Sequence, residues 1–332
     1  MGLFRYFATR IGTYFLVMFI GLTVIFILPR LMPGSPVETY LMQVQQQSGN
    51  QLSPEDVAKI RSSLQDLYGL GGSLSSQYVG FLRRVVTMDF GFSITAYPRP
   101  VSEFIQNALP YTMGLMLTSI ILSWTLGNLI GLLAGFFNNR SWATVLEVIG
   151  VVLYPIPYYI LALVLVFLLA YTWPIFPLTT TIRPGPLTPE KIQEILRNSI
   201  LPGLTIVLAQ FGWNILGMKA LAFSTKEEAY VNFARLKRVP PLTIMTKYVA
   251  RNAILPQVTA LALSMGNLFN GQIITESMFS YPGHGTIMRG AVSTGDYNLL
   301  YGTIAITIVA VSTAALVIDL AYPLFDPRIR YR

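Results

Sequence analysis

The sequence predicts an all-α integral membrane protein. We expect six transmembrane helices, both termini in the cytoplasm, and a small outward-facing domain between the first and second helices. Composition is the first reason, because 53% of the 332 residues are hydrophobic and 11% are charged, whereas a soluble protein carries about 25% charged residues. The apolar residues also form long runs, and a nearly uncharged run of 18 or more is long enough to cross a bilayer. The mean hydropathy is +0.55.

Six apolar segments qualify as spans. They cover about residues 11–29, 110–137, 143–171, 200–223, 256–279 and 300–323. The first follows a short head with Arg5 and Arg10, but its apolar run is longer than that of a signal peptide and no small-residue cleavage site follows. We therefore read it as an uncleaved helix, and we divide the chain into segments 1–29, 30–108, 109–323 and 324–332.

The basic residues predict the orientation. With six spans both termini lie on one side of the membrane, and 13 of the 23 Lys and Arg residues fall on that side against three acids. Cytoplasmic loops carry such an excess, whereas long translocated segments count little. Both termini and the segment 224–255 are therefore predicted to be cytoplasmic, in a cell (inner) membrane.

Segment 30–108 is the one region that resembles a soluble protein. Ser53 can cap a helix, Pro54 suits its first position, and Glu55 and Asp56 favour the positive end of the helix dipole. Gly69 is a stop signal. A second helix is expected from Ser76 to Val86. This domain is too small for an independent enzyme with an obvious site.

The cytoplasmic segment 224–255 interrupts the apolar sequence with EEAYVNFARLKR at 227–238. A helix is expected from Lys226 to Lys237, Pro240-Pro241 must end it, and a second helix fits Leu242 to Ala253. A solvated loop whose charges only set the topology is the alternative. The segment, however, also offers apolar residues that can pack against a partner: Tyr230, Phe233, Ala234, Val239, Ile244, Tyr248 and Val249.

Several motifs, in order along the chain, resemble one family. They are Pro33-Gly34-Ser35-Pro36, Tyr68-Gly69-Leu70, Gln77-Tyr78, Asp89-Phe90-Gly91-Phe92-Ser93, Pro100-Val101, Glu228-Ala229-Tyr230, Ala234-Arg235-Leu236-Lys237, Arg251 to Pro256, Tyr281-Pro282-Gly283 with Gly285, and Asp326 to Tyr331. Together they are similar to permeases of ABC importers, in particular the dipeptide/oligopeptide family. Each motif is weak alone, but their order over more than 300 residues is specific.

The resemblance implies a mechanism that the residues alone do not supply. Residues 224–255, named here the coupling segment, would sit in a groove on an ATPase subunit and transmit its closure on ATP to the spans. Glu228 would orient and anchor the corner, with Ala229 and Tyr230 beside it, and Ala234 would allow close packing. Polar contacts would come from Arg235, Lys237 and Arg251, and Pro256 would restart the membrane helix.

Position 238 departs from the family pattern. The family usually has glycine at the corner between the two helices, and this chain has Arg238. Glycine tolerates a positive φ, whereas arginine there is strained by roughly 1 kcal/mol or more. Two alternatives follow, either a strained corner or a corner built differently by Pro240-Pro241.

Polar residues inside the spans are candidates for lining a substrate pathway, because such groups must face other helices or water. Ordinary interhelical hydrogen bonding is the alternative. The candidates are Gln210, Asn214, Ser264, Asn267 and Asn270, together with Tyr154 and Tyr158, which flank two prolines that should bend the third span. Glu276 and the Pro282-Gly283 loop are expected to be structural or gating elements.

Other functions find little support. No G-x-x-x-x-G-K-[ST] pattern occurs, so the chain should not bind ATP by that route, and no catalytic motif for covalent chemistry appears. Without cysteine, disulfides and thiolate metal sites are excluded. His284 is the only histidine; we read it as a loop residue and expect no metal site. The basic residues do not suggest nucleic acid.

We therefore expect a non-enzymatic permease subunit in a lipid bilayer. The resemblance implies a second homologous permease, two cytoplasmic ATPase subunits that bind ATP and Mg²⁺, and an extracytoplasmic substrate-binding protein. Di- or oligopeptides are the first substrate class, with oligosaccharides or nickel as alternatives. A transporter driven by an ion gradient is the rival of a different class, but the spans largely lack the buried acids that it needs.

Overall fold

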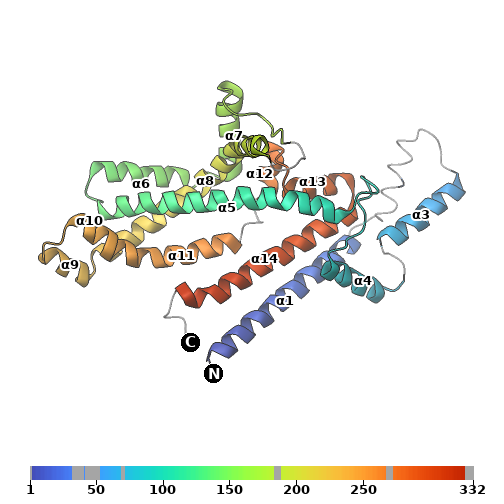
Figure 1. The fold of residues 1–332 in the computed structure, drawn as a ribbon, viewed down its shortest axis with the longest axis horizontal. Coiled ribbons are helices and arrows are strands. Elements are labelled where there is room, and N and C mark those ends of the chain that lie inside the picture. The colour runs from blue at the N-terminus through green and yellow to red at the C-terminus, as the bar shows by residue number, and fades with distance from the viewer. Residues whose placement is uncertain are drawn as a thin grey trace. The chain divides into compact units, whose positions relative to one another are not determined.

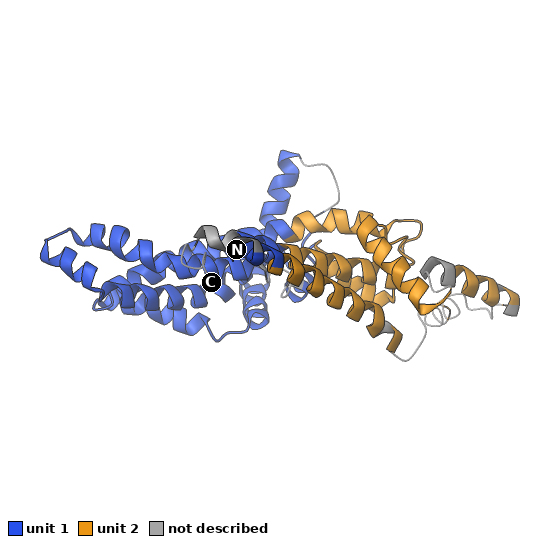
Figure 2. Ribbon diagram, turned by 90° about the horizontal axis from the view of Figure 1, so that it is seen from below, with its two compact units in different colours: residues 1–8, 113–281, 314–332 blue, residues 9–112, 282–313 orange. Residues whose placement is uncertain are grey.

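The structure is a computed structural model that describes residues 2–31, 41, 53–68, 72–182, 188–266 and 272–325. These residues form helices and loops (Figure 1), with one isolated bridge between Phe92 and Pro100 and no strand within the described ranges. The chain divides into two compact units, coloured blue and orange in Figure 2. Unit 1 comprises residues 1–8, 113–281 and 314–332, and unit 2 comprises residues 9–112 and 282–313.

The helices are divided between the two units. Unit 2 holds most of α1 (Gly2–Leu31), α3 (Pro54–Tyr68), α4 (Leu74–Thr87), the start of α5 (Val101–Phe136), α13 (His284–Thr294) and the first part of α14 (Tyr297–Phe325). Unit 1 holds the rest of α5, α6 (Ser141–Leu153), α7 (Tyr158–Val166), the π-helical η1 (Phe167–Thr172), α8 (Pro189–Lys226), α9 (Ala229–Leu236), α10 (Pro241–Thr243), the π-helical η2 (Ile244–Ala250), α11 (Arg251–Gly266) and α12 (Gln272–Phe279).

Four helices are long and apolar enough to cross a membrane. The qualifying stretches are Arg5–Leu28, Val101–Phe136, Pro189–Lys226 and Tyr297–Leu320. The pair α6 and α7–η1 counts as a fifth span if it is taken as one. The predicted span 256–279 corresponds to α11 and α12, which are each too short by themselves, and residues 267–271 between them lie outside the described part.

The third predicted span is broken and not merely kinked. The helix stops at Leu153 and restarts at Tyr158, and the two parts meet at 102°. Pro155 and Pro157 cause the break because neither can donate a backbone hydrogen bond. Pro157 instead accepts at the start of α7, where the N–H groups of Ile160 and Leu161 reach its carbonyl at 3.0 and 3.1 Å. The bend predicted at the two prolines is confirmed, and it is a full break in the helix where a kink was expected.

Glycines let other helices of unit 1 lie directly on the backbone of α8. Gly127, Gly131 and Gly135 recur every four residues on α5, a spacing that brings membrane helices close together. A Cβ atom added at Gly131 would lie 2.5 Å from the carbonyl oxygen of Ile215. On the side of α6, a Cβ at Gly212 would lie 2.7 Å from the carbonyl oxygen of Gly150. This glycine repeat is visible in the sequence, but the sequence analysis did not predict its role.

The buried carboxylate of Asp296 links two segments of unit 2 that are far apart in the sequence. Its Oδ1 caps α14 by accepting the N–H of Leu299 at 3.1 Å, and its Oδ2 accepts the hydroxyl of Ser93 at 2.5 Å and the N–H of Ile94 at 2.9 Å. Asp296 therefore fixes the Asp89–Ser93 motif against the start of α14, a role that we did not predict.

His284 is not a loop residue, which corrects the sequence-based reading. It is the first residue of α13 and is fully buried, and its Nε2 lies 3.0 Å from the carbonyl oxygen of Thr303 and 2.9 Å from the hydroxyl of Thr307. Burial lowers the pKa of His284, although the bond to Thr303 opposes this shift. The described residues hold no group of three His, Cys, Asp or Glu side chains that could bind a metal ion.

The close contact at Gly131 leads to a prediction for stability. We expect Gly131→Ala to lower the free energy of unfolding by about 1–3 kcal/mol, because the new methyl group overpacks against the backbone of α8. Gly114→Ala on the same helix is the matched control, since nothing lies within 4 Å of its added Cβ and alanine favours helix. Thermal unfolding in detergent compares the two. Equal stability of both variants would contradict the close contact.

Candidate functional site

The corner of the coupling segment follows α9. Arg238 adopts a positive φ of 57°. Its N–H donates to the carbonyl of Arg235 at 2.9 Å, and the N–H of Val239 donates to that of Ala234 at 3.1 Å. This pair of bonds is the Schellman motif, which normally places glycine where Arg238 stands. Of the two alternatives, the structure shows the strained corner, with Pro240 following it.

The second helix of the coupling segment runs further than predicted. It begins at Pro241, in the first turn where proline is tolerated, and continues through α10, η2 and α11 to Gly266. Pro256 lies inside α11, so the prediction that it restarts the membrane helix is wrong. Pro241 already supplies the start, and the π-helical η2 just before α11 shows that the helix tolerates an irregular hydrogen-bond ladder there.

An apolar core fixes the coupling segment to the ends of α5 and α8. Val231 and Ala234 of α9 are buried, as are Ile244 and Val249 of η2. They form one cluster with residues of the neighbouring helices: Leu132, Phe136, Met218, Ala222, Met245 and Ala253. The corner is therefore packed firmly on α5 and α8. Ala234 is 4% exposed, in keeping with the close packing expected of it.

Hydrogen bonds brace both arms of the corner. The guanidinium of Arg235 donates to Asn232 Oδ1 at 2.9 Å and to the carbonyl oxygen of Lys226 at 3.1 Å. Across the two helices, Asn252 Nδ2 donates to the hydroxyl of Tyr230 at 2.9 Å and to the carbonyl oxygen of Tyr248 at 2.8 Å. Sequence reasoning missed Asn232 and Asn252, which lie within the quoted motifs.

The other predicted coupling residues lie on the surface. Glu228 occupies the N-cap position of α9, but its side chain is exposed and makes no capping hydrogen bond. Ala229 and Arg251 are also exposed. The ammonium group of Lys237 lies 4.6 Å from the ring centre of Phe233, within the range of a cation–π contact. The anchoring role of Glu228 stays a prediction.

The coupling segment also exposes large apolar side chains. Phe233 is 58% exposed, Leu236 is 83% exposed and Leu242 is 66% exposed. They flank the corner, and the exposed bases Arg235, Lys237 and Arg238 adjoin them in the sequence. An apolar patch within a polar rim is typical of a protein interaction site.

A cavity of about 500 Å³ lies between α5, α8, α11 and α12 of unit 1. Four of the predicted pathway residues line it, namely Tyr158, Gln210, Asn214 and Ser264, with Met116, Ile120, Ile156, Ile206, Ala209, Trp213 and Thr275. This described lining contains no Asp, Glu, Lys or Arg. The cavity thus offers neutral hydrogen-bonding groups among aromatic and aliphatic side chains.

The lining is partly held in place by other hydrogen bonds. Asn214 Nδ2 donates to Ser123 Oγ at 3.2 Å, and Ser264 Oγ donates to the carbonyl oxygen of Ala260 at 2.9 Å. Tyr154 does not line the cavity but stacks on Trp213, with ring centres 5.8 Å apart. Asn267 and Asn270 lie outside the described residues. The pathway role of these side chains stays a prediction.

The residues expected to be structural or gating elements lie at the end of α12 and the start of α13. Glu276 is fully buried, and its carbonyl oxygen accepts the N–H of Tyr281 at 2.8 Å. In unit 2, Pro282 precedes Gly283, which is the N-cap residue of α13. These contacts fit a structural role, and a gating role stays a prediction.

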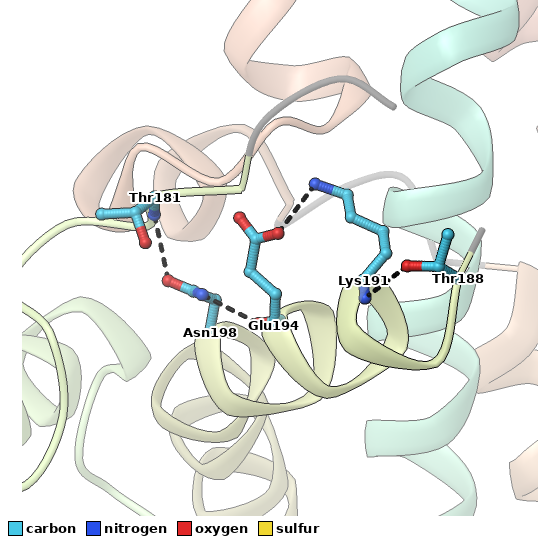
Figure 3. Close-up of polar contacts among 5 residues, drawn as sticks. All are labelled: Thr181, Thr188, Lys191, Glu194 and Asn198. Atoms are coloured by element: carbon cyan, nitrogen blue, oxygen red, sulfur yellow. Dashed lines mark hydrogen bonds and ion pairs between the residues drawn. The ribbon is translucent and has the colours of Figure 1, made fainter. Parts of the chain in front are cut away.

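A polar cluster organises the start of α8 (Figure 3), opposite to the end that meets the coupling segment. Thr188 caps the helix by accepting the N–H of Lys191 at 3.2 Å, and the buried Lys191 pairs with Glu194 at 3.1 Å. Asn198 Oδ1 accepts the N–H of Thr181 at 3.0 Å, so the preceding loop is held on the helix. Glu194 and Asn198 also line a pocket of about 520 Å³.

Comparison with known protein families shows to which family the chain belongs. The family described as "Binding-protein-dependent transport system inner membrane component" matches residues 127–331, more than half of the chain. The protein belongs to this family. The sequence-based resemblance to ABC-importer permeases is thereby confirmed, and the permease is a multi-pass component of the inner membrane that works with a substrate-binding protein and ATPase partners.

Relatives of this permease match along almost its whole length. It is 27% identical over 314 residues to a putative peptide permease protein of Brucella suis biovar 1 (strain 1330), covering 94% of this chain and 95% of the relative. It is 26% identical over 330 residues to the dipeptide transport system permease protein DppB of Bacillus subtilis (strain 168), covering 98% of each. The oligopeptide transport system permease protein AppB of the same strain is 27% identical over 318 residues, covering 94% of this chain and 95% of the relative.

The strained corner of the permease leads to a second prediction. We expect Arg238→Gly to raise the free energy of unfolding by about 1 kcal/mol, because glycine relieves the positive φ, and to leave ATP-coupled uptake largely unchanged. Lys237→Gly is the matched control, since φ is −75° there and the added backbone freedom only destabilises. Thermal unfolding and uptake assays compare the two. A collapse of uptake in Arg238→Gly would show that the arginine makes a required contact.

Proposed function

We propose that this permease forms half of the translocation pathway of an ATP-driven importer of di- and oligopeptides. It crosses the membrane six times with both termini in the cytoplasm. A second homologous permease supplies the other half, and two cytoplasmic ATPase subunits bind ATP and Mg²⁺. An extracytoplasmic binding protein delivers the substrate. The permease performs no covalent chemistry.

The exposed apolar face of the coupling segment is the observation that carries this proposal. Phe233, Leu236 and Leu242 face outward although the segment has a well-formed core beneath them. A surface of this kind suits a permanent protein partner, since burying each side chain contributes about 1.5–3 kcal/mol. The resemblance names an ATPase subunit as that partner.

The neutral cavity supports a pathway for peptides. Gln210, Asn214 and Ser264 can exchange hydrogen bonds with peptide amides, and Tyr158 and Trp213 can contact side chains of many shapes. A lining without fixed charges favours neither acidic nor basic peptides. Three relatives named above are peptide, dipeptide and oligopeptide permeases, and this likeness puts peptides before oligosaccharides or nickel.

Loss of the apolar face gives the third prediction. We expect Leu236→Asp to weaken association with the ATPase subunits at least about tenfold, because a central apolar contact is worth more than 1.4 kcal/mol, while the fold stays intact because the side chain is 83% exposed. Leu178→Asp is the control, since Leu178 is 51% exposed on the loop before α8. Co-purification and ATP-dependent uptake in liposomes are measured together. If the Leu236→Asp variant bound the ATPase subunits as tightly as the unchanged permease does, the proposal would be contradicted.

The same liposomes test the substrate and the energy source. The assembled complex, supplied with its binding protein, is expected to accumulate labelled dipeptides and oligopeptides only while ATP is hydrolysed. Accumulation without ATP hydrolysis would favour a transporter driven by an ion gradient. Uptake of oligosaccharides in place of peptides would overturn the substrate class but leave the ATP-driven importer standing.

A further inference from the structure

The helix α4 of unit 2 packs against the C-terminal end of α1. The hydroxyls of Tyr78 and Thr23 share a hydrogen bond of 2.6 Å, and Arg30 Nη2 donates to Gln77 Oε1 at 3.0 Å. The ring of Phe26 contacts those of Tyr78 and Phe81, with centres 5.0 and 5.7 Å apart. One face of α4 is thus fixed beside the last two turns of α1.

These contacts give the depth of α4 in the membrane. The apolar run of α1 continues to Pro29 and is followed by Arg30, and Thr23 precedes Pro29 by six residues, or about 9 Å along the helix axis. Tyr78 therefore reaches a level inside the hydrocarbon edge. Helices that lie in the interface bury their apolar side about 5–10 Å into the boundary between headgroups and acyl chains, and the position of α4 agrees with that depth.

The face of α4 that points away from the core is mixed, with two exposed valines among exposed serine, arginine and threonine side chains. Val79 is 65% exposed and Val86 is 83% exposed. They lie seven residues apart, so they share one side of the helix with the exposed Arg83 between them. On α1, Val24 and Ile27 near the same end are 52% and 44% exposed. The end of α1 against which α4 packs thus also exposes apolar side chains.

Basic and aromatic groups follow at the end of α4. Arg83 and Arg84 line a pocket of about 320 Å³ with Thr87, Asp89 and Gly91, and arginine binds the phosphate of a headgroup through two parallel hydrogen bonds. Beyond it, the exposed rings of Phe92 and Tyr97 pack edge to face, 5.7 Å apart. Aromatic rings of this kind gather at membrane interfaces.

We propose that α4 is an interfacial helix. It lies along the bilayer surface at the C-terminal end of α1, with Val79 and Val86 at the boundary between headgroups and acyl chains and with Arg83 at the lipid phosphates. The lipid bilayer, and not a further protein subunit, covers its outer face. The inference needs α1 to span the bilayer but is independent of the substrate and of ATP.

The absence of cysteine from the chain makes the test direct. Spin labels are attached to Val79→Cys and Val86→Cys, one at a time, in the full-length permease in phosphatidylcholine–phosphatidylglycerol vesicles. Accessibility to oxygen, which concentrates in lipid, is compared with accessibility to a water-soluble nickel chelate. Val24→Cys on α1 is the lipid-exposed control, and Ser62→Cys, exposed on α3, is the reference outside α4.

We expect both α4 labels to be readily accessible to oxygen. Their accessibility to the nickel chelate should be several-fold lower than that of the Ser62→Cys label. Arg83→Glu should move the label at position 86 toward water in vesicles with phosphatidylglycerol, whereas Arg61→Glu on α3 should leave it in place. Nickel accessibility at 79 and 86 equal to that at 62 would overturn the proposal by placing α4 in water. Exclusion of both reagents would overturn it by showing a protein partner on this face.

Discussion

The close contact between α8 and its neighbours is the constraint on which unit 1 depends. Glycines on α5 and α6 allow the backbones of these helices to contact α8 directly. In such close packing a shift of α8 would displace the helices beside it. The same helix carries the polar cluster at its start, Gln210 and Asn214 on the cavity, and Met218 and Ala222 in the core beneath the coupling segment. One helix therefore carries both the residues that line the cavity and those that pack against the coupling segment.

The coupling segment is packed and cross-linked by hydrogen bonds on all sides but one. Its inner face is a packed core, its two arms are joined through Tyr230 and Asn252, and its corner is closed by the hydrogen bonds at Arg238 and Val239. Only the outer face lacks cover. This arrangement supports the proposed role of the segment as the docking site of an ATPase subunit.

Sequence reasoning succeeded where the signal is local. The start of α3 at Pro54 follows from residue types and spacing, whereas the sequence left two alternatives for the corner at Arg238 and the structure decided between them. Thr188-Pro189-Glu190 repeats the start signal of Ser53-Pro54-Glu55, so the true start of α8 was also readable. Other features depend on tertiary packing. Prolines predict a break after Leu153 but not an angle of 102°, and neither the partners of Asp296 nor the approach of Ser264 to Gln210 is encoded in local sequence.

The central claim is that nucleotide binding by partner subunits, received at the coupling segment, changes access to the cavity on α8. The most direct measurement places a single cysteine at Gln210 of this cysteine-free chain and follows its labelling by a membrane-impermeant thiol reagent in the assembled complex. We predict that the reagent reaches position 210 from one side of the membrane without nucleotide and from the other side when ATP is bound and hydrolysis is blocked. Labelling that is the same in both states would contradict the claim.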